Sequence, residues 1–501
     1  MSCSSSIRPL EFSYANQTLT TDGRAQSRGI AVQVGTPPQL FALTPTTVLN
    51  NTFLNNIGAC GSDANTTCIQ DIGGGFNAKA SSTFRGTTAD AWNGSQEVSA
   101  DQFVNSGSVY FNDLITISSS ETLPGFPLLM EQTQGSGFYA ALGLGSNSTF
   151  INRLVEAGFA PSRSWSLYTG IYSDKSAGSL VIGGYAEEYF EGELYTQNTT
   201  TAVQIEGIEY NLPTWQITNF EYVEAGKTVN LMPDTNSLAM AVDPYYPILT
   251  VPENMLFAWG NATGGTWSED DLLYTYNASN VPSGNVTVTL ANGLKTTIPN
   301  NALFDPPAYD NGVLAAYRNG SSSTVYSTFT DWRFFGASDT PAGLFGVPYA
   351  AMVYLIRDYE RQTASIANAN QAALIGGDVT TICPLHSSKG HSSSHSNTGA
   401  IAGGVIGGVL GLALIGALIW FLLKRRKNKT STSDPALMEK SNGDYTKPAN
   451  TSYSMSEITE KPDTPITEIS GSPVKQELPA SRQPPKEMAA NIKVKRSELP
   501  A

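Results

Sequence analysis

Short runs rich in Val, Ile, Thr, Tyr and Phe alternate with turn residues through most of this 501-residue chain. Runs of this length, bounded by Gly, Pro and Asn, are typical of β-strands. Helical periodicity is confined to brief stretches such as Thr149–Gly158, where Phe150, Leu154 and Val155 fall on one face. The pattern therefore predicts an all-β protein, and the clearest strand candidates are Gly29–Val34, Ser108–Ile117, Val286–Leu290 and Ala351–Arg357.

One apolar run breaks this pattern near the C-terminus. Ala400–Leu423 is uncharged, and its roughly 24 residues at about 1.5 Å each can cross a hydrocarbon core of about 30 Å. Lys424-Arg425-Arg426-Lys427 follows at once, which places the C-terminal side in the cytoplasm. We predict a single transmembrane helix over residues 399–423, with the lipid bilayer as a partner and the preceding region outside the cell or in the secretory pathway.

Small residues recur within this apolar run. Gly403, Gly407 and Gly411 lie on one face, four residues apart. Such a stripe lets two helix backbones approach closely and predicts a transmembrane homodimer, although Gly is common in membrane spans in general.

The net charge has opposite signs on the two sides of the membrane segment. Residues 424–501 carry 14 of the 29 basic and 10 of the 43 acidic residues, so this tail has a net charge of +4 and the preceding region −18. The tail is rich in Ser, Thr, Pro, Lys and Glu with few aromatic residues, which predicts a disordered cytoplasmic tail over 424–501. The Ser-rich stretch before the membrane predicts a flexible stalk over 384–398. Before the stalk lie ten acceptor sequons for N-glycosylation: Asn16, Asn50, Asn65, Asn93, Asn147, Asn198, Asn261, Asn277, Asn285 and Asn319.

The histidines exclude several classes of enzyme. The three in the chain are His386, His391 and His395, all at or beyond the stalk. A Ser-His-Asp or Cys-His hydrolase and a His-based metal site are therefore excluded in the globular region. No Gly-rich loop leads into a Lys-Ser/Thr step, so nothing supports phosphate binding. We expect no cofactor, no metal and no nucleic-acid partner.

The segment Val242–Pro252 carries the strongest similarity to a known family. It resembles the second active-site loop of the pepsin-like aspartic peptidases, in which two hydrophobic residues precede Asp-Thr-Gly and a Pro stands nine positions after the Asp. Asp243 and Pro252 hold those places, whereas Pro244 and Tyr245 replace the Thr and the Gly. The segment Gly35–Phe41 is similar to the hairpin of the first lobe, which puts Thr46-Thr47-Val48 where the first Asp-Thr-Gly is due.

Further motifs extend the resemblance over about residues 27–375. In order, they are Ala141–Gly145, Ala177–Gly184, Phe190-Glu191-Gly192, Trp215-Gln216-Ile217 and Leu344–Glu360. The resemblance implies a bilobal pepsin-like fold with an N-terminal segment over 1–26, a first lobe over 27–190 and a second lobe over 191–383.

The resemblance also defines what has been lost. Catalysis in this family needs two carboxylates that share a proton, as the carboxylate pair of pepsin does. Thr46 occupies the first Asp position and cannot replace a carboxylate, and no acidic residue occurs from Thr36 to Ser62. The retained Asp243 is expected to be insufficient alone. Asp234-Thr235-Asn236-Ser237 is a displaced candidate for the second triplet, but its spacing to Pro252 is wrong, and a polar turn is the alternative.

Two other features follow from the family pattern. The flap that closes over substrate corresponds to Ala91–Ser95, where Trp92 is the candidate anchor and a strand aromatic beside an Asn-Gly turn is the alternative. The resemblance implies two disulfides, Cys60–Cys68 after the first active-site loop and Cys3–Cys383 across the ends of the globular region. Met1-Ser2-Cys3-Ser4 has no apolar core, so we expect the true N-terminus and a signal peptide upstream.

These observations predict a membrane-anchored, catalytically degenerate relative of the aspartic peptidases that binds a peptide or a cell-wall glycan in its interlobe cleft. One alternative is an active surface endopeptidase that uses Asp243 and an unrecognised second acid. Another is a non-enzymatic spacer with a signalling tail.

Overall fold

The computed structural model describes residues 7–61, 66–95, 109–118, 121–131, 139–171, 176–199, 203–205, 208–210, 212–233, 235–304, 324–335, 342–373 and 375–385. All of these belong to one compact unit within residues 1–391. The predictions for Cys3, Asn65, Asp234, Asn319, the three histidines, the membrane segment and the tail lie outside the described residues.

The N-terminal half is built from short strands. They are β1 (Leu10–Thr18), β2 (Gln26–Val34), β3 (Gln39–Thr46), β4 (Phe53–Asn56), β5 (Gly75–Phe76), β6 (Arg85–Thr87), β7 (Val109–Thr116), β8 (Thr122–Glu131), β9 (Ala141–Gly143), β10 (Ser164–Tyr168), β11 (Gly178–Ile182), β12 (Gly184–Ala186) and β13 (Phe190–Asn198).

The C-terminal half continues in the same way. Its strands are β14 (Val203–Ile205), β15 (Ile208–Tyr210), β16 (Thr214–Glu224), β17 (Lys227–Asn230), β18 (Leu238–Val242), β19 (Leu249–Thr250), β20 (Thr266–Ser268), β21 (Leu273–Asn277), β22 (Asn285–Leu290), β23 (Lys295–Ile298), β24 (Thr324–Tyr326), β25 (Phe329–Thr330), β26 (Ala342–Phe345), β27 (Val353–Asp358), β28 (Thr363–Ala369) and β29 (Val379–Thr381). The four predicted strands correspond to β2, β7, β22 and β27, and the all-β prediction is confirmed.

Helices are short and few among the described residues. They are α1 (Thr66–Asp71), α3 (Thr149–Glu156), α4 (Glu253–Thr263), α5 (Asn300–Leu303) and α7 (Val347–Ala350), with single 3₁₀ turns η1 (Ile57–Cys60), η2 (Ala78–Ala80), η3 (Ala89–Ala91), η4 (Glu187–Tyr189) and η6 (Trp332–Phe335). The predicted helix is α3. It begins because Ser148 Oγ accepts from the amide of Ile151, and it buries Phe150 and Leu154. In this part of the chain, no helix has the length and apolarity to cross a membrane.

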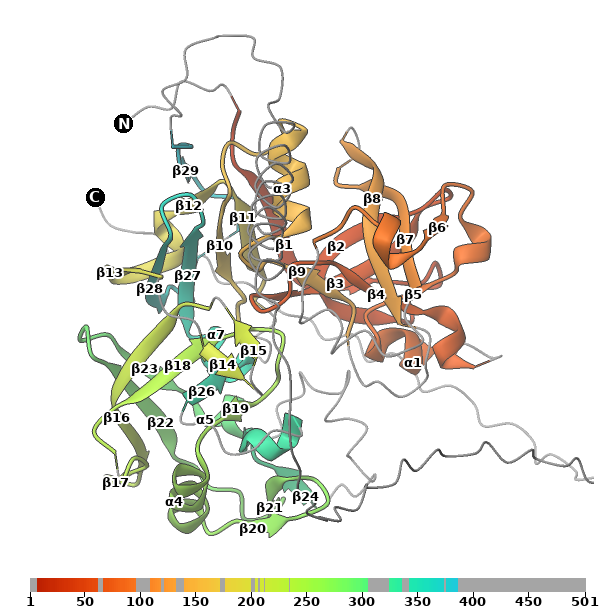
Figure 1. The fold of residues 1–501 in the computed structure, drawn as a ribbon. Coiled ribbons are helices and arrows are strands. Elements are labelled where there is room, and N and C mark those ends of the chain that lie inside the picture. Colours follow the sequence, from red (N-terminus) through yellow and green to blue (C-terminus); the bar gives the residue numbers. More distant parts are fainter. Residues whose placement is uncertain are drawn as a thin grey trace, which may run out of the picture. The chain divides into compact units, whose positions relative to one another are not determined.

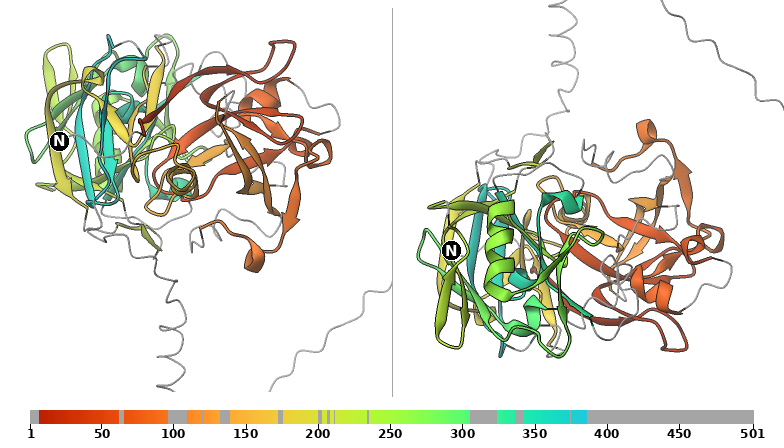
Figure 2. Two further views of the ribbon diagram at one scale, coloured as in Figure 1. Left: turned by 90° about the horizontal axis from the view of Figure 1, so that it is seen from above. Right: turned by 90° about the horizontal axis from the view of Figure 1, so that it is seen from below.

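Two large sheets organise the fold. The 14-stranded sheet runs β13-β28-β27-β10-β11-β1-β2-β3-β9-β4-β8-β7-β6 with β5 on β4, and the eight-stranded sheet runs β23-β22-β16-β18-β26-β19-β25 with β17 on β16. Strands from the N-terminal and C-terminal halves therefore meet in the first sheet, where β27 pairs with β10. In Figures 1 and 2 the red and orange strands of the first lobe and the green strands of the second form separate bodies, as expected for a bilobal pepsin-like fold.

The same local arrangement occurs once in each lobe. β9 pairs in parallel with β3 and antiparallel with β4, and β26 pairs in parallel with β18 and antiparallel with β19. The backbone must pass closely at Gly143 and Gly346, because a Cβ there would lie 2.5 Å from Asn51 O and 1.8 Å from Tyr246 O. Each lobe thus holds one loop, 47–52 or 243–248, against a glycine-containing strand.

Candidate functional site

The two loops meet at Thr46 and Asp243, both of which are fully buried. The Thr46 hydroxyl donates a hydrogen bond of 2.8 Å to Asp243 Oδ2. Because Thr46 ends β3 and Asp243 follows β18, equivalent positions of the two lobes face each other. The structure therefore places Thr46 where the partner of the Asp243 carboxylate would stand.

The Asp243 carboxylate is surrounded by hydrogen-bond donors. Besides the Thr46 hydroxyl, it accepts from the amides of Tyr245 at 3.0 Å, Thr47 at 3.3 Å and Val48 at 3.3 Å. Burial raises the pKa of Asp243 to about 6, and these four donors oppose that rise because they favour the ionised form. Three of the donors come from the first lobe, so this carboxylate links the lobes.

A threonine hydroxyl makes a second link. Thr47 Oγ1 donates to the carbonyl of Val242 at 3.0 Å. The equivalent residue of the second loop is Pro244, which has neither a hydroxyl nor an amide hydrogen. The first loop therefore donates a hydroxyl hydrogen bond to the second lobe through Thr47, and Pro244 cannot donate the corresponding bond in return. Reasoning from sequence did not identify Thr47 and Val48 as contacts of Asp243, because both donate from backbone amides.

Large side chains stand at both positions where the family pattern has Gly. Val48 is 9% exposed and Tyr245 is 5% exposed, and both belong to one apolar cluster that draws residues from the two lobes. Tyr245 packs edge-on against Tyr139 and Tyr246, and its hydroxyl donates to the carbonyl of Tyr139 at 3.0 Å. The volume beside the Asp243 carboxylate is consequently occupied by the protein's own side chains.

Trp92 belongs to the interior of the first lobe. It follows η3, is 4% exposed, and donates from Nε1 to the carbonyl of Phe111 at 3.3 Å. Its ring packs edge-on against Tyr110 and covers Gly94, where a Cβ would lie 2.2 Å from the indole. The first lobe thus fixes the indole. Trp92 lies outside any strand, whereas the alternative interpretation placed it on one. Its role as a flap anchor stays a prediction.

The local disulfide is confirmed. Cys60, at the end of η1, and Cys68, in α1, are bonded with a Cα–Cα distance of 5.6 Å. Cys383 is also disulfide-bonded. Its predicted partner Cys3 lies outside the described residues, so that pairing stays a prediction.

Most of the described sequons are accessible. Asn50 is half-buried. The seven exposed ones are Asn16, Asn93, Asn147, Asn198, Asn261, Asn277 and Asn285. Asn50 Oδ1 accepts from the amide of Asn147 at 2.8 Å and lies against Gly145, where a Cβ would be 2.4 Å away.

We expect Asn50 to carry no glycan and Asn16, Asn198, Asn261, Asn277 and Asn285 to be occupied when the protein passes through the secretory pathway. A glycan on Asn50 would have to displace its packing against the first active-site loop. Glycopeptide mapping of the expressed protein checks this, with the exposed sequons as the internal control. Full occupancy at Asn50 would contradict the expectation.

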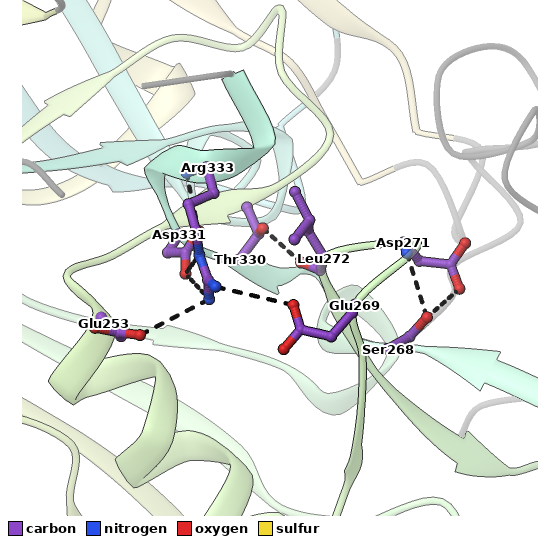
Figure 3. Close-up of polar contacts among 8 residues, drawn as sticks. All are labelled: Glu253, Ser268, Glu269, Asp271, Leu272, Thr330, Asp331 and Arg333. Carbon is purple, nitrogen blue, oxygen red and sulfur yellow. Dashed lines mark hydrogen bonds and ion pairs between the residues drawn. The ribbon is translucent and has the colours of Figure 1, made fainter. Parts of the chain in front are cut away.

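A separate charged cluster lies in the second lobe, around Arg333 (Figure 3). Its guanidinium contacts the buried Asp331 carboxylate at 2.6 Å and lies 3.9 Å from Glu253 and from Glu269. The same guanidinium lies over the Trp267 ring at 5.4 Å. Arg333 thereby joins α4, the β20–β21 segment and η6. Its charge is satisfied, and no metal-binding group of acids or histidines occurs among the described residues.

The chain is similar to several known proteins. The chain is 24% identical to gastricsin of Callithrix jacchus over 283 residues and 25% identical to gastricsin of Homo sapiens over 286 residues, in both cases over 54% of this chain and 66% of the relative. It therefore spans slightly less than two thirds of these relatives' length. The aspartic proteinase from Irpex lacteus has a TM-score of 0.48 and 17% identity, over 73% of this chain and 99% of that one.

Two families match the sequence. The epidermal growth factor receptor transmembrane-juxtamembrane segment matches residues 401–430, which hints at a membrane anchor. The family described as eukaryotic aspartyl protease matches residues 29–323, more than half of the 501 residues. The chain belongs to the eukaryotic aspartyl protease family.

Proposed function

We propose that this chain is a membrane-anchored member of its family that does not hydrolyse peptides and instead binds a ligand through its aspartyl-protease-like domain. The observation that carries the proposal is the hydrogen bond between Thr46 and Asp243. Peptide hydrolysis by a carboxylate pair needs one group that takes a proton from water and another that delivers one to the carbonyl. Thr46 can do neither in the relevant pH range, and loss of one acid–base partner costs about 10²–10⁴ in rate.

The packing around Asp243 supports the same conclusion. Val48 and Tyr245 fill both Gly positions, and the carboxylate already accepts four hydrogen bonds from the protein. An attacking water would need one of those carboxylate lone pairs and space beside it. Both are taken.

The membrane anchor is a further part of the proposal. Its support is the apolar run with its basic flank, the family match over residues 401–430, and the number of exposed sequons. A peptide or a cell-wall glycan is the proposed ligand class. Binding on peptide and glycan arrays tests this, and deletion of residues 430–501 separates binding by the domain from a role that depends on the tail.

We expect no cleavage of a denatured protein substrate by the purified, glycosylated protein from about pH 2 to 7, the range in which a carboxylate pair can share a proton. Asp243→Ala is the matched control and should be equally silent.

The family membership and the retained Asp243 favour one other function, an active endopeptidase with a second acid elsewhere. Cleavage that is lost in Asp243→Ala and blocked by a statine-type transition-state analogue would establish that function and remove the binding-only proposal.

A further inference from the structure

Arg357 is a buried cation that forms no ion pair with any described carboxylate. It lies in β27, is 4% exposed, and its Nη1 atom has no hydrogen-bond partner. A guanidinium cannot lose its proton in a protein, and an unpaired buried charge is strongly unfavourable. Arg333 shows the contrast, since its guanidinium has the buried Asp331 carboxylate at 2.6 Å although the arginine side chain is 43% exposed (Figure 3).

A second arginine reaches the same face of the sheet. In the antiparallel pair β10–β27, Trp165 lies opposite Arg357, and the amide of Tyr359 donates to the carbonyl of Arg163 at 3.0 Å. Residues two apart on a strand share a face, so Arg163, Trp165, Arg357 and Tyr359 form a cross-strand square. The Nε atom of Arg163 is buried and also lacks a partner, while its Nη2 atom donates to the carbonyl of Ser146 at 2.8 Å.

The polar atoms of Trp165 and Tyr359 already have hydrogen-bond partners. Trp165 Nε1 donates to Leu144 O at 3.2 Å and to Tyr359 Oη at 3.1 Å, and the Tyr359 hydroxyl also donates to Leu144 O. The Arg357 guanidinium stacks 5.1 Å from the centroid of the Tyr359 ring. These contacts and a hydrogen bond to the Tyr359 side chain hold the guanidinium in place, and they leave its Nη1 atom without an acceptor.

The nearby acids do not provide that acceptor. Asp358 points to the opposite face of the strand, as alternation requires, and is paired with Arg361 at 2.6 Å. Glu360 accepts from the backbone amides of Arg163 at 3.0 Å and Leu385 at 2.6 Å. Burial lowers the pKa of Arg357, and the Tyr359 side chain and then the Asp358 carboxylate oppose that fall.

We infer that Arg357 and Arg163 form an internal binding site for one small monovalent anion, a halide or a single carboxylate. The anion would accept from Arg357 Nη1 and Arg163 Nε and offset one of the two positive charges on this face of the sheet. The site also adjoins the candidate functional site, because Leu144, whose carbonyl caps the square, donates from its amide to Thr46 O at 2.8 Å. An anion here would therefore stiffen the strand that supports the first active-site loop.

The first experiment is thermal unfolding of the full-length protein in detergent, with chloride varied from about 1 to 200 mM against gluconate at constant ionic strength. For a Kd near 10 mM, we expect the unfolding temperature to rise by about 4 °C. Formate in place of chloride distinguishes a carboxylate from a halide, and a rise with either anion supports the site.

Two variants make the result specific. Arg357→Met should match or exceed the wild type at low chloride, because removing an unpaired buried charge relieves its cost, and should show no rise with chloride or formate. Arg28→Met is the matched control. Arg28 lies in β2 of the same sheet, but its guanidinium already donates to Thr169 O and Ser176 O. This variant should be less stable and keep the full anion dependence.

The inference is overturned if the unfolding temperature of the wild type changes with neither anion. It is also overturned if the unfolding temperature of Arg357→Met rises with them as much as that of the wild type. Diffraction from crystals grown in bromide tests it without a variant. We expect an anomalous peak within hydrogen-bonding distance of Arg357 Nη1, and the absence of a peak there when other bromides are visible overturns the halide form as well.

Discussion

Replacing Thr46 by Asp is expected to destabilise the protein at pH 7 by about 3–5 kcal/mol and to leave it without peptidase activity. The Thr46 hydroxyl lies 2.8 Å from Asp243 Oδ2, and both residues are fully buried. Two carboxylates at this distance cannot both be ionised, so one of them must hold a proton. Its folded-state pKa is then raised above the unfolded value. The stability contributed by that proton is present at low pH and is lost as the pH rises through the raised pKa.

Urea unfolding at pH 4 and pH 7 measures this effect. Thr46→Asn is the matched control, since an amide has the size of the carboxyl group without its charge and can still donate to Asp243. We expect Thr46→Asp to be much less stable at pH 7 than at pH 4 relative to Thr46→Asn. Equal stability of the two variants at both pH values would show that the loops can accommodate a second charge.

Activity should remain absent in Thr46→Asp because the defect has several parts. Val48, Pro244 and Tyr245 stand where the family pattern has Gly, Thr and Gly. Tyr245 lies in the apolar cluster and donates its amide to Asp243, so removing its ring would open a cavity as well as space for substrate. Residues that act as a unit in catalysis are not additive, and repairing one of them leaves the unit broken.

The strands predicted from the sequence, β2, β7, β22 and β27, are six to nine residues long, and β27 was recognised although every one of its residues is buried. The sequence did not predict β19 or β25, because two buried residues carry no period. The helix α4 was also missed, although Pro252 and Glu253 at its start and Gly264 with φ of 68° at its end are recognised boundary signals. A local signal existed there and was outweighed by the β-rich surroundings.

The candidate site divides in the same way. Asp243 and Thr46 could be identified from spacing, because the family pattern fixes their places along the chain. The amides of Thr47 and Val48 could not be assigned to Asp243, because backbone donors carry no residue signature. Nothing in the sequence indicated that Arg357 would be buried with its Nη1 atom unpartnered. Its burial depends on which side chains share one face of a sheet assembled from residues far apart in sequence.

Asp243→Asn is expected to remove a pH dependence of stability that the wild type shows between about pH 4 and pH 6. Burial raises the pKa of Asp243 from 3.8 to about 6. A carboxyl group with a raised folded-state pKa contributes stability that is present below the unfolded pKa and is lost as the pH rises through the folded pKa. A shift of this size corresponds to about 3 kcal/mol lost over that range.

The measurement is the free energy of unfolding of wild type and Asp243→Asn at half-unit steps from pH 3.5 to 7. The variant is itself destabilised by about 1–3 kcal/mol, since its amide faces the donors that the carboxylate satisfied. Val48 N retains Thr46 Oγ1 as an acceptor at 3.3 Å, which limits this cost.

The informative quantity is the difference between the two curves, because all other titrating groups cancel in it. That difference should favour the wild type most near pH 4 and shrink by about 3 kcal/mol by pH 6.5. Parallel curves would mean that the four donors hold the pKa of Asp243 near its ordinary value. The residue would then be a permanently ionised link between the lobes, with no remnant of the proton exchange that a peptidase needs.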